Sequence, residues 1–125
     1  MNTLSLDEMQ FFDGASDALE IYMALAGCIR ARWPDVRVKV QKSQICFSNR
    51  YGFAYAWLAQ RRIKTSAKLG VSFGLPVRLD CPRIFRAVEP YPNRWTHHVL
   101  LSSPDAVDNV LMGWIQAAYD FSAHK

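Results

Sequence analysis

The sequence lacks the features that mark membrane, secreted and metal-binding proteins. No apolar run approaches the roughly 18–20 residues that a helix needs to span a bilayer. The first residues are acidic and show no basic start followed by an apolar core, so we expect no signal peptide. Cys28, Cys46 and Cys81 are widely spaced and form no C-x-x-C pair. These absences predict a cytoplasmic protein with reduced thiols, no structural zinc and no membrane association.

Signatures of catalysis and of cofactor binding are also missing. The chain contains no G-x-S-x-G elbow, P-loop or dinucleotide-binding fingerprint. It also shows no legible helix-turn-helix, zinc finger or RNP-type aromatic motif. We therefore predict no catalytic residue, no metal and no cofactor, and the sequence favours a binding role over an enzymatic one.

Acidic residues are nearly absent from the middle of the chain. Residues 36–104 contain only Asp80 and Glu89 against twelve lysines and arginines, a balance of +10. Residues 1–35 have a balance of −4 and residues 105–125 a balance of −2, within a net charge of +4. A basic middle between acidic ends favours an anionic partner, with nucleic acid as the leading candidate.

The composition is that of a folded protein. The 125 residues are 50% hydrophobic and 21% charged, which argues against disorder. A chain of this length matches one ordinary domain and buries roughly two-thirds of its unfolded surface. Because no repeat, linker or low-complexity tract interrupts the chain, we predict a single domain over residues 1–125.

Helical signals open the chain. Ser5 and Glu8 have the spacing of a capping box, and Ser16 is expected to cap a longer helix that ends before Pro34. The apolar stripe of this helix is expected to contain Ala18, Ile21, Tyr22, Leu25, Cys28 and Ile29. Its cysteine is therefore interpreted as an inert small hydrophobe.

A second long helix is expected near the end of the chain. Ser103 is expected to supply its N-cap and Pro104 its first position, where the missing N–H has no cost. Its predicted apolar stripe consists of Val107, Val110, Leu111, Trp114, Ala118 and Phe121.

Between the helices the apolar pattern has the period of two that is typical of strands. The expected strands cover residues 36–40, 45–47, 53–58, 69–75 and 95–101. Residues 84–88 fit either a short strand or a helical turn. The run of residues 53–58 is apolar on both faces, with Phe53, Tyr55 and Trp57 on one of them, which is typical of a central strand.

These elements predict an α+β fold. We expect a two-layer sandwich with an N-terminal helix, a four- to five-stranded, mostly antiparallel sheet, and a C-terminal helix on the same sheet face. The opposite face is expected to carry Arg37, Lys39, Gln41, Cys46, Ser48, Gly70, Ser72, Gly74, Thr96 and His98. This basic face could be open, or covered by a partner subunit.

The adjacent histidines His97 and His98 do not predict a metal site. Neighbours on a strand point to opposite faces, so the two imidazoles cannot bind one ion together. General-base catalysis would need a nucleophile or carboxylate in reach, and no spacing in the sequence places one there. We interpret His97 as a hydrogen-bonded histidine near the core edge and His98 as a surface residue.

Several motifs resemble an uncharacterised bacterial family of domains of unknown function. The residues concerned are the run Pro92–Val99, an Asp near a helix start, Trp114, Ala118-Tyr119, Gln41–Ile45, Phe53-Ala54 and Phe11-Phe12. The resemblance covers nearly the whole chain and implies its fold rather than an activity. The helix–sheet–helix order is also loosely similar to frataxin-like and YjbR-type small proteins, a likeness of fold that does not imply function.

The resemblance and the charge pattern together nominate positions for binding an anionic ligand. These candidates are Lys39, Lys42, Arg83, Arg94, Trp95, Thr96, His97 and His98. Lys42 follows a strand beside a turn, where a cation could reach an anion, and Arg83 follows Pro82 in a similar way.

Three functions stay open at this point. The first is a non-catalytic binding domain whose basic sheet region contacts an anionic partner, with nucleic acid as the leading candidate. The second is a small-molecule sensor or enzyme with a pocket near Trp95 and His97 that uses Lys42 and Arg83. The third is an interaction module that buries its second sheet face in a homodimer, so the chain could be a monomer or a homodimer.

Overall fold

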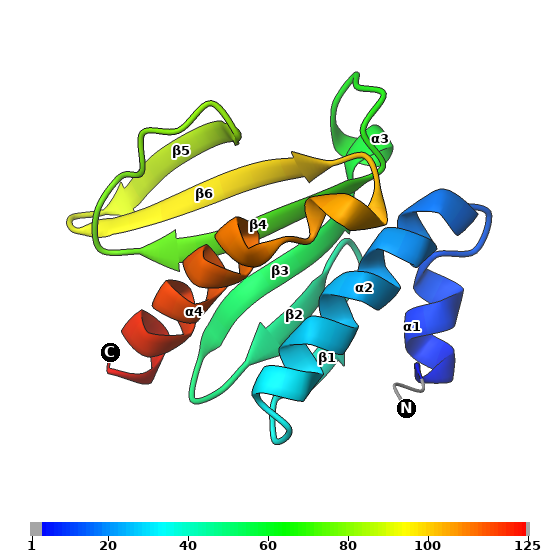
Figure 1. Ribbon diagram of the computed structural model, residues 1–125, viewed down its shortest axis with the longest axis horizontal. Helices are drawn as coiled ribbons and strands as arrows, with labels where there is room; N and C mark the ends of the chain where they lie inside the picture. The colour runs from blue at the N-terminus through cyan, green and yellow to red at the C-terminus, as the bar shows by residue number, and fades with distance from the viewer. Residues whose placement is uncertain (1–3, 125) are drawn as a thin grey trace.

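The computed structural model describes residues 4–124 as a six-stranded sheet with helices before and after it (Figure 1). The elements in chain order are α1 (Leu6–Phe11), α2 (Ser16–Arg32), β1 (Arg37–Val40), β2 (Ile45–Ser48), β3 (Gly52–Leu58), α3 (Ala59–Arg62), β4 (Leu69–Leu75), β5 (Ile84–Tyr91), β6 (Arg94–Leu101), the 3-10 turn η1 (Pro104–Ala106) and α4 (Asn109–Ala123). The predicted α+β class is confirmed. None of the helices in the described part is long and apolar enough to cross a membrane.

The sheet is antiparallel throughout and has the strand order β1-β2-β3-β4-β6-β5. The strand beyond the five expected ones is β5. The sequence pattern of this segment fitted either a strand or a helical turn. β5 lies at an edge of the sheet, and its pairing with β6 is interrupted by two irregularities. Because bulges break the period of two and an edge strand is largely exposed, this strand carries no clear alternation in sequence.

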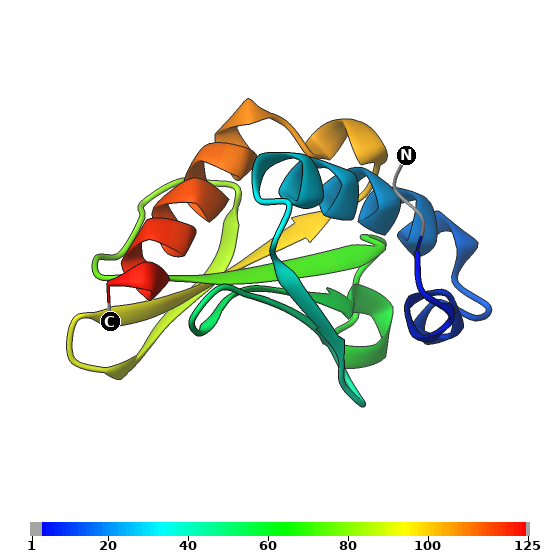
Figure 2. The same cartoon turned by 90° about the horizontal axis from the view of Figure 1, so that it is seen from below.

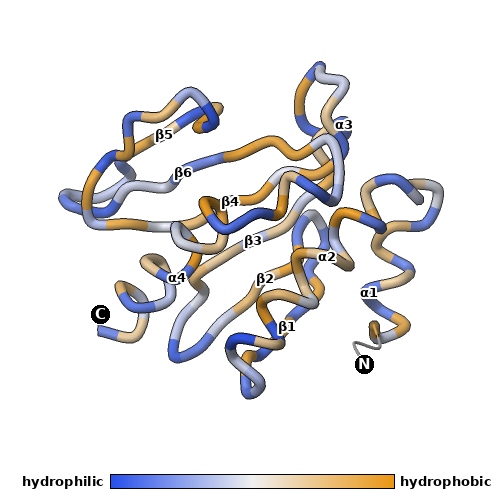
Figure 3. The backbone as a smooth tube through the Cα atoms, in the orientation of Figure 1, coloured by the Kyte–Doolittle hydropathy of each residue, from blue (hydrophilic) through white to orange (hydrophobic). Residues whose placement is uncertain are grey.

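Both long helices pack on one face of the sheet, as predicted (Figures 1 and 2). Between helices and sheet lies a core of fully buried side chains, which include Ile45, Phe47, Leu69, Val71, Phe73, Val99 and Leu101 from the strands. These residues occupy alternate strand positions, so the core-facing side of β2, β4 and β6 follows the predicted alternation. In Figure 3 the central strands β3 and β4 are mainly white and orange, whereas turns at the sheet ends are blue.

The central strand β3 departs from the alternation at its start. A register shift between β2 and β3 falls at Phe47 and Ser48. Phe53 is consequently buried, and its ring contacts those of Trp33 and Tyr119 from the helical layer. The prediction that Phe53 shares a face with Tyr55 and Trp57 is therefore wrong, because the irregularity turns Phe53 towards the helices.

The N-terminal helices begin with one predicted and one mispredicted cap. The capping box of Ser5 and Glu8 is present in α1. Helix α2 begins at Ser16, but the residue before it occupies the cap position and makes no side-chain bond, so the predicted Ser16 cap is wrong. Cys28 is exposed, and Ala26 is buried in its place. The buried face of α2 is thus slightly rotated from the predicted stripe.

Helix α4 begins later than the sequence predicts. Pro104 opens only the short turn η1, and α4 starts at Asn109, where the Asp108 side chain accepts the Leu111 N–H at 3.0 Å. Burial is centred on Leu111, Met112, Ile115, Ala118 and Ser122, whereas Val110 is 51% exposed. The predicted stripe is therefore partly wrong. The chain is not helical between η1 and Asn109, so α4 starts in a different rotational position and turns a different side to the sheet.

Candidate anion-binding face of the sheet

In Figure 2, α2 and α4 lie on one side of the sheet, and we call the opposite side the uncovered face. The strand register places one row of side chains across the whole sheet on this face. Directly paired positions in neighbouring strands give the order Lys39, Cys46, Tyr55, Ser72, His98 and Arg86. This set, the cross-strand row, has a cation at each end and polar or aromatic side chains between them. Four of its members lie on the face that strand alternation predicts for them, while Tyr55 and Arg86 complete the row.

A hydrogen-bonded chain holds the middle of this face. The Trp57 indole N–H donates to Ser72 Oγ at 2.8 Å, and Ser72 Oγ lies 2.7 Å from His98 Nδ1. The indole lies flat over Gly70. A Cβ atom built on Gly70 would lie only 2.3–2.4 Å from the Trp57 ring atoms, so the indole occupies the space that a side chain would need. The Cζ atom of Arg62 sits 4.8 Å from the Trp57 ring centroid. Trp57 is therefore only 3% exposed and serves as the support beneath Arg62.

His98 is held in its neutral form. Burial lowers its pKa below the ordinary value, and the positive charges of Arg86 and Arg62 lower it further. In the neutral tautomer whose Nδ1 accepts the Ser72 hydroxyl, the other ring nitrogen carries the proton and can donate to a ligand. Ser72 is 5% exposed and its oxygen already accepts the Trp57 N–H, so this pair positions groups rather than presenting a nucleophile.

Tyr55 and Cys46 form a second polar contact in the cross-strand row. Burial raises the pKa of Cys46, while a hydrogen bond with Tyr55 and the charge of Lys39 act in the opposite direction. Burial and the neighbouring thiol raise the pKa of Tyr55. Both groups are therefore protonated and uncharged at neutral pH, and the charge of the row comes from its two ends.

The electrostatic character of the uncovered face is positive. Arg37, Lys39, Arg86 and Arg94 take part in the strand pairing, whereas no paired position in the described sheet holds Asp or Glu. Arg62 adds a further cation above Trp57. The face therefore offers several cations to an anion, and the one acid within the described strands, Glu89 of β5, accepts the Asn93 N–H at 3.1 Å.

Other basic residues of the middle segment are engaged elsewhere. Lys68 lies 3.9 Å from Asp17 of α2, and the Cζ atom of Arg78 lies 5.9 Å from the ring centroid of Trp95. The predicted concentration of positive charge on the sheet is therefore partial, since some of these side chains turn towards the helical layer or its border.

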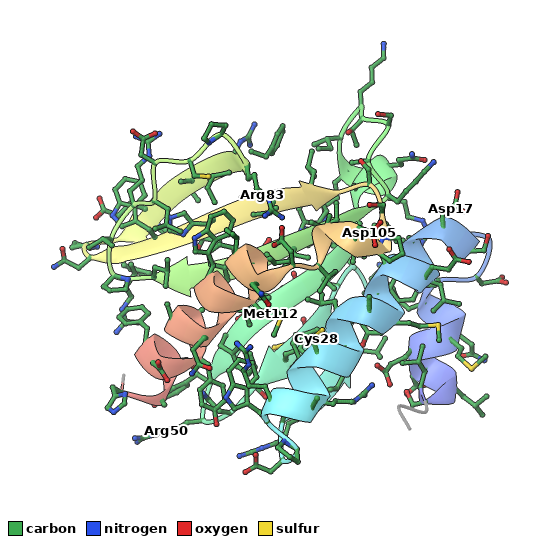
Figure 4. All side chains as sticks on the ribbon, viewed as in Figure 1. Asp17, Cys28, Arg50, Arg83, Asp105 and Met112 are labelled. Carbon is green, nitrogen blue, oxygen red and sulfur yellow. The ribbon has the colours of Figure 1, made fainter. Side chains whose placement is uncertain are left out.

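Arg83 belongs to the group that is engaged elsewhere (Figure 4). One of its terminal nitrogens lies 3.0 and 2.9 Å from the two carboxylate oxygens of Asp108, and the other donates to the Ala106 carbonyl at 3.0 Å. Its Cζ atom also lies 5.6 Å from the Trp114 ring centroid. The structure thus places Arg83 as the link between β5 and the start of α4.

The other predicted site residues divide between the two faces of β6. Arg94, Thr96 and His98 alternate with Trp95 and His97, and only the first three share the uncovered face.

His97 is fully buried on the helical side of the sheet. It accepts the Leu79 N–H through Nε2 at 2.9 Å and stacks on Phe73 at 5.3 Å. Burial lowers the pKa of His97. The histidine predicted near the core edge thus lies inside the core, where it orders the segment between β4 and β5.

Lys42 lies apart from the cross-strand row. It lines a cavity at the corner of the sheet together with Arg61 and Arg62, and the residues around this cavity include none of Trp95, His97 and Arg83. The sequence showed Arg61 and Arg62 only as part of a basic connection. Nothing in that stretch indicated that it turns back towards Lys42. Among residues 4–124, no group of three or more His, Cys, Asp or Glu side chains is arranged to hold a metal ion.

Comparison with known families identifies the chain. A model for a domain of unknown function, DUF5655, matches residues 8–122, so the chain belongs to this family. This confirms the resemblance to a family of unknown function. A search of curated proteins gave no match, and a search of solved structures gave none either.

Proposed function

We propose that this member of DUF5655 is a non-catalytic binding domain whose uncovered face holds single-stranded nucleic acid. The observation that carries the proposal is the cross-strand row, with Lys39 and Arg86 at its ends and rings between them. Cations along such a surface neutralise phosphates, and flat side chains stack on bases.

The dimensions of the row suit a short stretch of single strand. Five inter-strand spacings of about 4.8 Å make it roughly 24 Å long, enough for several nucleotides. Tyr55 and His98 are half-buried and lie in the row, and the Arg62 guanidinium is supported from below by Trp57. These three flat groups are the candidates for base stacking, because the Trp57 ring itself is covered.

The test is a titration of short single-stranded DNA and RNA across a salt series. With about four phosphate contacts, the slope of log affinity against log salt should be close to −3, at roughly 0.7 per contact. Affinity no better than about millimolar at roughly 50 mM salt, or a flat salt dependence, would contradict the proposal, since non-specific binders already reach about 10⁻⁴ M.

Matched variants assign the binding to the uncovered face. Lys39→Met and Arg86→Met should each weaken binding and flatten the salt slope by about 0.7, because each removes one phosphate contact. Lys64→Met is the control, since Lys64 is an exposed cation in the segment after α3, outside the strands. An equal effect of all three variants would indicate diffuse attraction rather than a site on this face.

A further inference from the structure

A small cavity lies at the corner where α1, the β1–β2 turn and α3 meet. Its volume is about 150 Å³, and it is lined by Phe11, Lys42, Ser43, Leu58, Arg61 and Arg62. Arg62 belongs both to this cavity and to the uncovered face, because its guanidinium also lies over Trp57. The cavity is therefore continuous with that face through one side chain.

The lining is cationic and contains no acid. Lys42, Arg61 and Arg62 supply three positive charges, and the remaining lining residues are uncharged. The nearby carboxylate of Asp17 lines an adjoining cavity with Arg61 but pairs with Lys68 at 3.9 Å. Three like charges around one small space repel one another, and an anion inside it would relieve that repulsion.

Part of the lining is already held in position. Arg62 Nη2 donates to the Ser43 carbonyl at 2.9 Å, and the same guanidinium stacks on the Trp57 ring. An arginine has five N–H donors, so this bond leaves donors free for a ligand. Holding the cation before binding reduces the entropy that a ligand must overcome.

The size of the cavity selects a compact anion. A cavity of about 150 Å³ has room for a compact group such as a phosphate, which has five heavy atoms. A base or sugar would have to remain outside, against the uncovered face or in solvent. Three cations favour a dianion over the single negative charge of a phosphodiester.

We propose that the cavity of Lys42, Arg61 and Arg62 binds the phosphate group of a phosphomonoester. The remainder of the ligand lies outside the cavity, beyond Arg62. This proposal does not depend on nucleic acid binding across the sheet, because Lys42 and Arg61 are not part of the cross-strand row.

The first experiment uses inorganic phosphate at about pH 8, where it is mainly a dianion. At constant ionic strength, we expect saturable changes in the backbone amide NMR signals of Phe11, Ser43 and Arg61. Lys42→Met and Arg61→Met should each weaken binding about tenfold or more, the loss expected for one charge-assisted hydrogen bond. Lys64→Met, matched in charge but outside the cavity, should stay within about twofold.

Two results would overturn the proposal. One is the absence of saturable shifts in the wild-type protein. The other is phosphate binding that Lys42→Met and Arg61→Met leave unchanged while their spectra show the native fold. The dispersed amide spectrum of each variant distinguishes loss of the site from loss of folding.

A second experiment distinguishes the two sources of such a phosphate. A 5′-phosphorylated single strand that binds about tenfold more tightly than its 5′-hydroxyl counterpart would identify a nucleic-acid end, if Lys42→Met removes the gain and Lys39→Met does not. Phosphate binding without any gain for the oligonucleotide would support the cavity and point to a small phosphorylated metabolite. In that second outcome, nucleic acid binding by the uncovered face is still tested by the Lys39→Met and Arg86→Met titrations. The two proposals can therefore fail separately.

Discussion

Gly70 is the residue on which the packing of the uncovered face depends. Its missing side chain lets the Trp57 indole lie against β4, and the indole in turn supports Arg62 and donates to Ser72. Because Gly70 has no side chain, Trp57 can contact Arg62 of the cationic part and Ser72 of the hydrogen-bonded part of the surface at the same time.

Replacing this glycine should therefore disturb stability. In Gly70→Ala the new Cβ would lie 2.3 Å from the Trp57 ring, so the ring or the strand must shift. We expect a loss of about 1–3 kcal/mol in the free energy of unfolding, as is usual for overpacking, measured by urea denaturation. Gly74→Ala on the same strand is the control, because its nearest non-adjacent atom is 3.9 Å away. Equal stability of the two variants would show that the indole does not need this space.

Helix α1 illustrates how an element too short to be stable alone is held in place. It has six residues, fewer than an isolated helix requires. Its Glu8 carboxylate, 2% exposed, accepts hydrogen bonds from the Tyr22 hydroxyl and from Arg30 at 3.0 Å, both on α2. Burial alone would raise the pKa of Glu8, but bonds from the Ser5 amide, Tyr22 and Arg30 hold it below its ordinary value. α1 is thus attached through one buried charge.

Neutralising that charge should loosen α1. Glu8→Gln leaves Arg30 without its charged partner, and we expect a large loss, up to about 3 kcal/mol, with faster hydrogen exchange of the α1 amides. Because the folded pKa of Glu8 is lowered, its contribution is present above the unfolded value near 4.5 and is lost as pH falls below it.

The variant should therefore lose less stability on acidification than the wild type. Glu20 is an exposed acid on α2, and Glu20→Gln is the control. Its free energy of unfolding by urea should match that of the wild type both at neutral pH and at a pH below about 4.5. Unchanged exchange in Glu8→Gln would mean that apolar contacts alone hold the helix.

At the scale of the whole molecule, β5 is one of the two edge strands of the sheet and exposes large apolar side chains through which copies of the chain could associate. Phe85, Val88 and Tyr91 are 48%, 42% and 66% exposed there, which could favour a homodimer. The same strand contains Pro90 and two breaks in its pairing register. A proline and bulges blunt an edge, because they remove a donor and twist the strand away from a partner.

We therefore predict a monomer in sedimentation at micromolar concentration. Val88→Lys, which adds a charge to the exposed edge, should sediment like the wild type. Any wild-type dimer would contradict the prediction. Dissociation by Val88→Lys would place the dimer contact at the β5 edge, whereas a dimer that resists this variant would favour the alternative that buries the second sheet face.

Features of this protein that depend on residue spacing within one element could be predicted from the sequence, whereas features that depend on contacts between distant elements could not. Capping by Ser5 and the faces of Ile45, Phe47 and His98 were predictable, because each depends on spacing within one element. The start of α4 was not, since Asp108 competes with Ser103 as a cap and holds Arg83 from the turn before β5. Sequence spacing cannot show which of two cap residues gains a tertiary partner.

By itself, the sequence determined the α+β class, the basic middle of the chain and the side chains that share a face of the regular strands β2, β4 and β6. These follow from composition and from the alternation that every strand imposes on its own residues. Only the tertiary structure decided that the row from Lys39 to Arg86 is continuous, because strand order and register depend on contacts between distant segments. It alone also decided that Lys42 meets Arg61 and Arg62, because the direction in which turns and short helices fold back is not encoded in any local period.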